Sequence, residues 1–284
     1  CKLKRGLYGL KQAPRCWNKR FAEFLIHRRF KQSDADPCLF IRKQGARKLM
    51  LALYVDDGLV ASMDGRELQE FEEELKSEFK ITAKLASYFL GLEINKDKEG
   101  NVKVSQSSYT RKILEKFGMS RCRPCSTPIT KSEKDLSGNE AETEDVKFPY
   151  RSAVGALMYL MTGTRPDIAY AVGVASRSLE NPSKSNEVQV KQIFRYLQST
   201  VDIGIIYKSG QSNALTAYSD ADHGGDKTSG RSTSGVLCMF AGGVVSWSSQ
   251  RQASVAISTT EAEIVAASEA TREVVWLKRL LNDI

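Results

Sequence analysis

The sequence predicts a mixed protein of helices and strands, of the α+β or α/β class, organised in two compact units. Short apolar runs of strand length alternate with segments whose apolar residues recur at helical spacing. The chain has 284 residues, enough for two domains of ordinary size, and a stretch rich in Pro, Ser, Thr, Asp and Glu over 120–147 divides it. With 41% hydrophobic and 27% charged residues, the chain can bury a core, which excludes wholesale disorder.

Local spacing predicts the elements of the first half in order. Apolar residues recur at helical spacing after Pro14, which suits a first turn, so a helix is expected over 14–30. Apolar runs bounded by turn residues then predict strands, and the acidic turn between two of them carries Asp56 and Asp57. The elements expected after the first helix are strands over 38–42, 48–55, 58–63, 88–94 and 102–105 and helices over 66–79 and 109–117.

Beyond the polar stretch, helices come first and strands follow them. Apolar residues at helical spacing predict helices over 149–161, 166–179 and 185–198. The remaining elements are strands over 203–208, 215–219, 235–240 and 243–249 and a long closing helix over 260–281.

Composition narrows the partners and the compartment. Lys and Arg number 42 against 34 for Asp and Glu, and the net charge of +8 favours a polyanionic partner. No run approaches the roughly 18 to 20 apolar residues of a membrane helix, so no membrane partner is expected. The six Cys are scattered, which indicates reduced thiols in a cytosolic or nuclear setting and no secretion. Since the chain starts without Met or a signal-peptide pattern, we infer that it is cut from a longer reading frame.

The motif Tyr54-Val55-Asp56-Asp57 lies between two apolar strands. Two carboxylates about 4 Å apart repel by roughly 1 kcal/mol in water and by about 4 kcal/mol at an effective dielectric near 20. A tight turn that presents both therefore favours a divalent cation, and such cations stabilise the attacking and leaving oxygens in phosphoryl transfer. The alternative is a solvated Asp-Asp turn without a metal.

Together with motifs along the whole chain, this hairpin resembles the reverse transcriptase of copia-type LTR retrotransposon Pol polyproteins. The motifs occur in the order found in that family. Those similar to its reverse transcriptase and connection regions are 7–15 (LYGLKQAPR) with Trp17, 88–94 (YFLGLEI), 149–155 (PYRSAVG) and 164–168 (TRPDI). Those similar to its ribonuclease H domain are 218–222 (YSDAD), 231–235 (RSTSG), 247–249 (WSS) and 258–263 (STTEAE).

The resemblance implies a partial reverse transcriptase palm and thumb followed by a ribonuclease H-like domain. Residues 1–119 would be the reverse transcriptase fragment, with the palm and the start of the thumb. The segments after it would be a polar linker over 120–147, a helical connection region over 148–200 and a C-terminally truncated ribonuclease H-like domain over 201–284.

The resemblance also implies roles for single residues. Asp56 and Asp57 match the catalytic metal-binding carboxylates of the polymerase, while Asp220 and Glu263 match two acidic positions of the ribonuclease H site. Each pair would hold Mg²⁺ or Mn²⁺. The positions that match nucleotide-binding or nucleic-acid-binding segments are Tyr54, Lys11, Gln12, Arg15, Leu90 and Gly91. Of these, the basic side chains suit phosphates, although a solvated basic face is the alternative.

The implied activities are RNA-directed DNA synthesis and hydrolysis of the RNA strand in an RNA–DNA hybrid. The partners would be an RNA template, a DNA primer, the hybrid itself, deoxynucleoside triphosphates, and the protease and integrase of the Pol polyprotein. The location would be the cytoplasm, in virus-like particles, and the nucleus.

Catalytic acids of the family are expected upstream of residue 7 and downstream of residue 281. Since carboxylates that hold metals supply transition-state stabilisation, we expect the 284-residue chain alone to show little or no polymerase or nuclease activity. Robust magnesium-dependent primer extension by the isolated chain would contradict this expectation.

Local departures from the family keep a second function open. Residues 81–87 lack the usual Asp-Leu-Gly, residues 186–189 replace a His-Trp pair, and His223 stands where Trp is common. The alternative is therefore a catalytically dead or domesticated remnant that only binds nucleic acid.

Other conspicuous residues have ordinary explanations. Cys122 and Cys125 have the spacing of half a zinc site, but no second pair follows, so free thiols are expected. His223 is expected to be a polar loop residue. Stacking on bases is open to the three tryptophans, but each lies on an apolar pattern that favours core packing, namely Trp17, Trp247 and Trp276.

Overall fold

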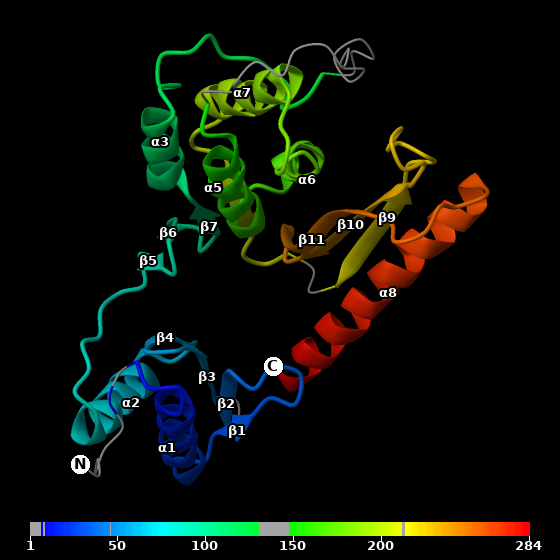
Figure 1. Cartoon of the computed structure of the whole chain (residues 1–284). Helices are drawn as coiled ribbons and strands as arrows, with labels where there is room; N and C mark the ends of the chain where they lie inside the picture. Colours follow the sequence, from blue (N-terminus) through cyan, green and yellow to red (C-terminus); the bar gives the residue numbers. More distant parts are fainter. Residues whose placement is uncertain (1–6, 8, 46, 131–147, 212–213) are drawn as a thin grey trace. The chain divides into compact units, whose positions relative to one another are not determined.

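The computed structural model describes residues 7, 9–45, 47–130, 148–211 and 214–284 (Figure 1). Contacts divide the chain into two compact units, the first formed by residues 1–90 with 275–284 and the second by residues 91–274. Each unit contains a hydrophobic core of its own.

The first unit is built on an antiparallel sheet whose strands lie in the order β1-β2-β3-β4. Leu49, Leu51 and Leu53 alternate along β3 and are buried on one face, together with Phe21 of α1 and Phe71 of α2. β3 is therefore a firmly held strand that leads into the acidic turn. The elements are α1 (Ala13–His27), β1 (Lys31–Gln32), β2 (Leu39–Gln44), β3 (Arg47–Tyr54), β4 (Asp57–Ser62), α2 (Gly65–Glu78) and the short β5 (Tyr88–Phe89).

A buried arginine joins α2 to this sheet. Arg42 of β2 is 5% exposed, and its guanidinium lies 3.3 Å from the Glu74 carboxylate and 3.7 Å from that of Glu67. It also lies 5.0 Å from the ring centre of Phe30 and 5.4 Å from that of Phe71. Ion pairs and cation–π contacts thus add to the apolar packing of α2.

The second unit begins with an antiparallel run of strands and a cluster of helices (Figure 1). The strands are β6 (Leu92–Lys96), β7 (Val102–Ser105) and β8 (Gly204–Tyr207). The helices are α3 (Ser107–Lys116), α5 (Tyr150–Gly163), the short 3₁₀ helix η1 (Pro166–Ile168), α6 (Ala169–Ser176) and α7 (Lys184–Ser199). They share a core in which Leu157 of α5, Val172 of α6 and Phe194 of α7 are fully buried.

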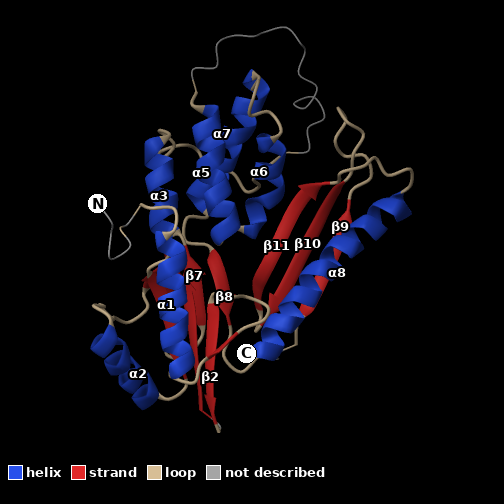
Figure 2. Cartoon of the chain, turned by 60° about the horizontal axis from the view of Figure 1, so that its bottom comes forward, coloured by secondary structure: helices blue, strands red, loops and turns tan. Residues whose placement is uncertain are grey.

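A three-stranded antiparallel sheet and residues 259–274 of a long helix complete this unit, and this part of the helix runs along the sheet (Figure 2). The last residues of the helix, 275–283, belong to the first unit. These elements are β9 (Thr216–Ala221), β10 (Thr233–Phe240), β11 (Gly243–Arg251) and α8 (Thr259–Asp283). Ala262, Ala266 and Ala270 form a buried stripe along α8, four residues apart. The Ser246 hydroxyl of β11 donates a hydrogen bond to the Glu273 carboxylate at 2.6 Å, so the face that carries Ser246 is the one covered by α8.

Most predicted helices and strands are confirmed with small shifts at their ends. The short strand β1 was not expected, and the helix expected over 166–179 begins as η1 and continues as α6. The strand expected over 88–94 is broken into β5 and β6, because Leu90 and Gly91 adopt positive φ angles of 51° and 84°. The strand expected over 203–208, β8, pairs with β7, an element about a hundred residues earlier in the chain. Gly204 allows this approach, since a Cβ there would lie 2.4 Å from the carbonyl oxygen of Val104.

The expected polar linker over 120–147 is described only in its first part. There, the N–H of Cys125 donates to the Arg195 carbonyl at 3.3 Å, and the Ser199 hydroxyl donates to the Cys125 carbonyl at 3.1 Å, so this part lies along α7. Residues 131–147 lie outside the described residues. The two units divide at 90/91 and at 274/275, and the four segments expected from the sequence remain predictions of domain identity. None of the helices in the described ranges has the length and apolar character needed to cross a bilayer.

Candidate functional site

The acidic motif forms the tip of the hairpin between β3 and β4. Tyr54 pairs with Asp57, so Val55 and Asp56 are the two residues of the connection. Val55 has a φ of 56°, in the left-handed region that β-branched residues avoid. All four side chains of the motif are exposed, which leaves both carboxylates open to solvent and to a ligand.

Trp17 connects this turn to α1. Its indole N–H donates a hydrogen bond of 2.7 Å to the carbonyl oxygen of Val55. The ring packs against Phe21 and Phe79, with centroids 5.4 Å and 5.5 Å away. The prediction that Trp17 packs on the core is confirmed, and the bond to the turn is a contact that spacing alone could not reveal.

The three polar residues of the LYGLKQAPR segment lie at the start of the same helix. Gln12 is the N-cap position of α1, Lys11 precedes it, and Arg15 lies in the first turn. Their side chains are exposed. The positive end of the helix dipole and the two cationic side chains suit a phosphate group. The Trp17 bond places the helix that carries them at the Asp56–Asp57 turn.

The donor set at this turn is a pair of adjacent carboxylates. Magnesium is commonly held by one or two carboxylates together with substrate phosphates and water, so Asp56 and Asp57 suit such an ion. Within the described ranges, no group of three or more His, Cys, Asp and Glu residues is arranged to hold a metal. The turn could thus supply part of a coordination shell, with the remaining ligands coming from elsewhere.

Leu90 and Gly91, expected to contact nucleic acid, form the tight turn between β5 and β6. Leu90 is 39% exposed. At Gly91, a Cβ atom would lie 1.9 Å from the hydroxyl oxygen of Tyr159 on α5. Glycine is therefore required at 91 both for its φ and for the close approach of α5.

Asp220 lies on the face of its sheet that points away from α8. It pairs with Gly235 of β10, whereas Cys238, three residues further along β10, pairs with Ser246 on the α8 face. Side chains alternate along a strand, so Asp220 points to the other face. There it lines a cavity of about 390 Å³ between the sheet and the η1–α6 segment.

Glu263 does not line this cavity. It is exposed in the first turns of α8. The described residues that do line it with Asp220 include Asp167, Tyr170, Tyr218, Asp222 and Trp247. Except for Tyr170, these residues lie in the sequence motifs, but the motifs gave no sign that η1 and α6 form one wall of the cavity, since that depends on packing between distant segments.

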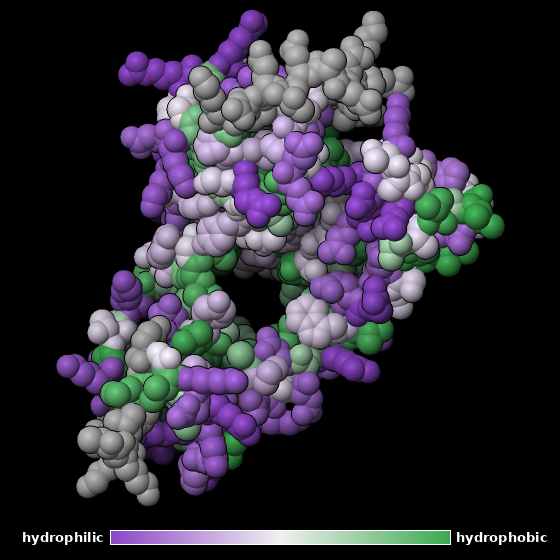
Figure 3. Space-filling view, viewed as in Figure 1, coloured by the Kyte–Doolittle hydropathy of each residue, from purple (hydrophilic) through white to green (hydrophobic). Residues whose placement is uncertain are grey.

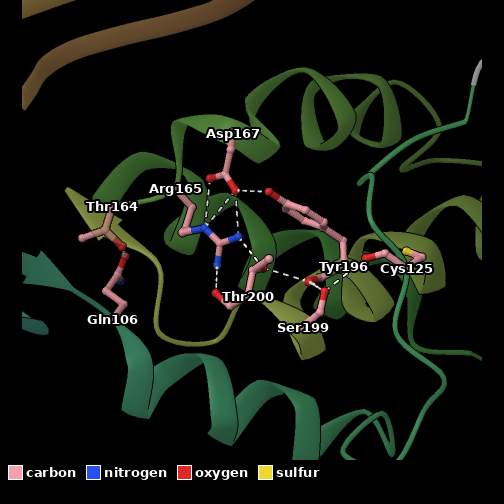
Figure 4. Close-up of polar contacts among 8 residues, drawn as sticks. All are labelled: Gln106, Cys125, Thr164, Arg165, Asp167, Tyr196, Ser199 and Thr200. Carbon is pink, nitrogen blue, oxygen red and sulfur yellow. Dashed lines mark hydrogen bonds and ion pairs between the residues drawn. The ribbon is translucent and has the colours of Figure 1, made fainter.

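Arg165 of the TRPDI segment is a structural residue that sequence reasoning missed (Figure 4). It is 1% exposed and forms three charge-assisted hydrogen bonds to Asp167, at 2.9 Å, 3.2 Å and 2.7 Å. It also donates to the carbonyl and hydroxyl oxygens of Thr200 at 2.8 Å and 2.7 Å. A cation thus satisfies the C-terminal end of α7 and ties it to η1.

The cysteines, the histidine and the other two tryptophans singled out in the sequence lie in the surroundings expected for them, except for one tryptophan. The expected free thiols are confirmed at Cys122 and Cys125, and burial raises the pKa of the Cys122 thiol. His223 lies near the Ala256 carbonyl, 3.3 Å from its Nε2. Trp247 is partly buried and donates to the Met161 carbonyl. The exception is Trp276, which is 40% exposed, so the expectation of core packing is wrong there.

Hydrophobic side chains also gather at the N-terminal end of α8 (Figure 3). Val255, Ile257 and Ile264 are 53%, 91% and 63% exposed.

Comparisons with known proteins relate the sequence of this chain to a reverse transcriptase family. The family model described as reverse transcriptase (RNA-dependent DNA polymerase) matches residues 1–131. The retrovirus-related Pol polyprotein from transposon TNT 1-94 of Nicotiana tabacum is 40% identical over 292 residues, which cover 100% of this chain and 22% of that polyprotein. The putative transposon Ty5-1 protein of Saccharomyces cerevisiae is 31% identical over 271 residues, 95% of this chain and 88% of that protein.

A third relative, an uncharacterized mitochondrial protein of Arabidopsis thaliana, is 35% identical over 235 residues, 80% of this chain and 94% of that protein. No solved structure gives a significant match. The chain spans about a fifth of the length of the Pol polyproteins from transposons TNT 1-94 and RE1. Matches of this extent confirm the resemblance read from the motifs: the chain belongs to the family of copia-type retrotransposon Pol polyproteins and carries their reverse transcriptase region.

Proposed function

We propose that this chain is part of an RNA-directed DNA polymerase in which Asp56 and Asp57 hold catalytic Mg²⁺ or Mn²⁺. The observation that carries the proposal is the pair of exposed carboxylates at the tip of the β3–β4 hairpin, in a chain of the reverse transcriptase family. When bound, the ion neutralises charge that develops on the transferring phosphoryl group. The role of the protein is then to fix both carboxylates at the end of the well-packed strand β3.

Substrate binding is assigned to the start of α1, to the β3–β4 turn and to the Leu90-Gly91 turn. Lys11 and Arg15 bind phosphates of the nucleotide or template, and Gln12 lies beside them. Tyr54 next to the carboxylates and the Leu90-Gly91 turn contact the primer. The substrates are an RNA template, a DNA primer and deoxynucleoside triphosphates, and the protease and integrase of the polyprotein are the protein partners.

A second activity, ribonuclease H cleavage of the RNA–DNA hybrid, is assigned to Asp220 and Glu263. Its support is the order of the four motifs between 218 and 263. Because Glu263 does not line the cavity that Asp220 lines, this centre needs either a rearrangement of the start of α8 or acids from other segments.

The polymerase proposal is tested by primer extension in a chimera. The chain replaces the matching segment of the Nicotiana tabacum polyprotein, to which it is 40% identical. We expect magnesium-dependent extension of a DNA primer on RNA. Asp56→Asn with Asp57→Asn should abolish it, while Asp34→Asn, an exposed carboxylate of the same unit, should leave it unchanged. The same chimera with Asp220→Asn should lose cleavage of the hybrid but retain extension.

The alternative is a remnant that only binds nucleic acid. Its support is the net charge of +8, because a basic protein is attracted to phosphate groups. A folded chimera that binds an RNA–DNA hybrid but neither extends a primer nor cleaves RNA would support it. Absence of hybrid binding by the 284-residue chain at low salt would remove both functions, since each requires phosphate contacts.

A further inference from the structure

We infer that Trp17 is a positioning residue for the Asp56–Asp57 turn and that it acts through its indole N–H. The inference rests on the proposed metal-binding role of the turn. It assigns a chemical task to one atom of α1 that makes no contact of its own with a reacting group.

The turn needs an external support because its backbone is strained. Val55 has a φ of 56°, a conformation that is disfavoured for β-branched residues and persists only where the surroundings impose it. The Tyr54–Asp57 pair closes the hairpin below the turn, and the side chain of Val55 itself is 53% exposed, so side-chain burial gives little hold.

The hydrogen bond from Trp17 acts on the peptide group that leads into the carboxylates. The carbonyl of Val55 and the N–H of Asp56 belong to one planar peptide unit. A donor that fixes this carbonyl, at 2.7 Å, therefore fixes the plane from which the Asp56 backbone continues. Without the donor, the peptide plane can rotate and the carboxylates lose their common orientation.

The donor is itself rigidly held. The Trp17 ring packs against Phe21 and Phe79, and α1 is anchored in the core by Phe21 and by Leu25, which is fully buried. A site on a well-packed helix holds a geometry better than one on a loop, because its supporting side chains are locked by packing. The hydrogen bond thus transmits the rigidity of α1 to the turn.

Trp247 provides a matched control. Its indole N–H also donates to a backbone carbonyl, that of Met161, at 3.0 Å. Among non-glycine residues of the described ranges, positive φ angles occur at Arg29, Val55, Leu90 and Ala241, so Met161 is not one of the strained positions. Removal of either N–H costs one hydrogen bond, but only the loss at Trp17 releases a strained turn beside carboxylates.

The experiment measures Mn²⁺ affinity of the 284-residue chain by water proton relaxation, together with thermal stability. Trp17→Phe removes the N–H and part of the ring, whereas 3-benzothienylalanine at position 17 keeps the ring size and removes only the N–H. We expect both to weaken Mn²⁺ binding by about fivefold, the factor of one ordinary hydrogen bond. Trp247→Phe should leave the Mn²⁺ affinity unchanged, while it should lower the melting temperature about as much as Trp17→Phe does.

The double variant Asp56→Asn with Asp57→Asn tests the metal site separately from the role of Trp17. If this double variant binds Mn²⁺ as well as the unmodified chain, the proposed metal site is wrong. If it abolishes binding but the benzothienylalanine variant binds as tightly as the unmodified chain, the metal site stands and the role of the Trp17 N–H is overturned.

Discussion

Val55 shows how one residue can oppose the local preference of the chain. A β-branched side chain at a φ of 56° is costly, about 1–3 kcal/mol for a strained backbone position. The hairpin keeps it because Tyr54 and Asp57 must pair across a connection of two residues.

Val55→Gly should therefore relieve strain. We expect its free energy of unfolding to exceed that of Val55→Ala by about 1 kcal/mol, since glycine adopts positive φ freely and alanine does not. Urea unfolding of the two variants measures the difference. A less stable glycine variant would show that the backbone of this turn is not strained.

Residues differ in how well the sequence predicts their role. The Asp56–Asp57 hairpin could be predicted because the motif lies between two apolar runs and turns are local. The burial of Arg42 and Arg165 could not, because each depends on partners far along the chain, such as Glu74 for Arg42 and Thr200 for Arg165. A buried arginine looks the same in the sequence as one on the surface.

Among the secondary-structure elements, the β5–β6 turn is held by a close approach of α5. Gly91 and Gly118 both have positive φ angles, 84° and 69°, but a Cβ at Gly118 meets nothing within 4 Å. The two glycines therefore share one conformational requirement and differ in the space around them.

Gly91→Ala should destabilise the chain more than Gly118→Ala, by about 1–3 kcal/mol, the range for forcing an extra carbon into a packed site. Addition of Tyr159→Phe, which removes the hydroxyl that the new Cβ would meet, should recover part of the loss. Thermal unfolding compares the variants. Equal losses for the two alanine variants would mean that α5 does not press on the turn.

The start of α7 contains an acid with two basic partners. Lys191 and Lys184 donate hydrogen bonds to the carboxylate of Glu187, and they hold its pKa below the ordinary value of 4.5. A carboxyl whose pKa falls on folding stabilises the native state above its unfolded pKa, and this contribution is lost as the pH falls through the folded pKa.

Glu187→Gln should accordingly be less stable than the unmodified chain at pH 7, and the gap should narrow as the pH falls below about 4.5, where the unfolded carboxyl takes up a proton. Glu180→Gln, at an exposed position just before α7, should show no such pH dependence. Urea midpoints between pH 3 and pH 7 provide the comparison. A gap that widens toward acid pH would reverse the assigned direction of the pKa.

For the whole molecule, the order of helices and strands could be predicted, because alternating and helical spacing are properties of short windows. The partner of β8 could not, since its pairing with β7 joins residues about a hundred positions apart. The cavity beside Asp220 likewise depends on η1 and α6 meeting a sheet that comes later in the chain. Elements that depend on neighbouring residues were thus predictable, while contacts between segments far apart in the chain were not.

We propose the exposed Asp56–Asp57 turn as the metal centre of a reverse transcriptase region. Paramagnetic broadening of backbone amide signals by Mn²⁺, recorded on the 284-residue chain, locates bound metal directly. We expect selective broadening around Tyr54, Asp56 and Gly58, and we expect it to be lost in the Asp56→Asn and Asp57→Asn double variant. Broadening that leaves this turn untouched, or that persists unchanged in the double variant, would contradict it.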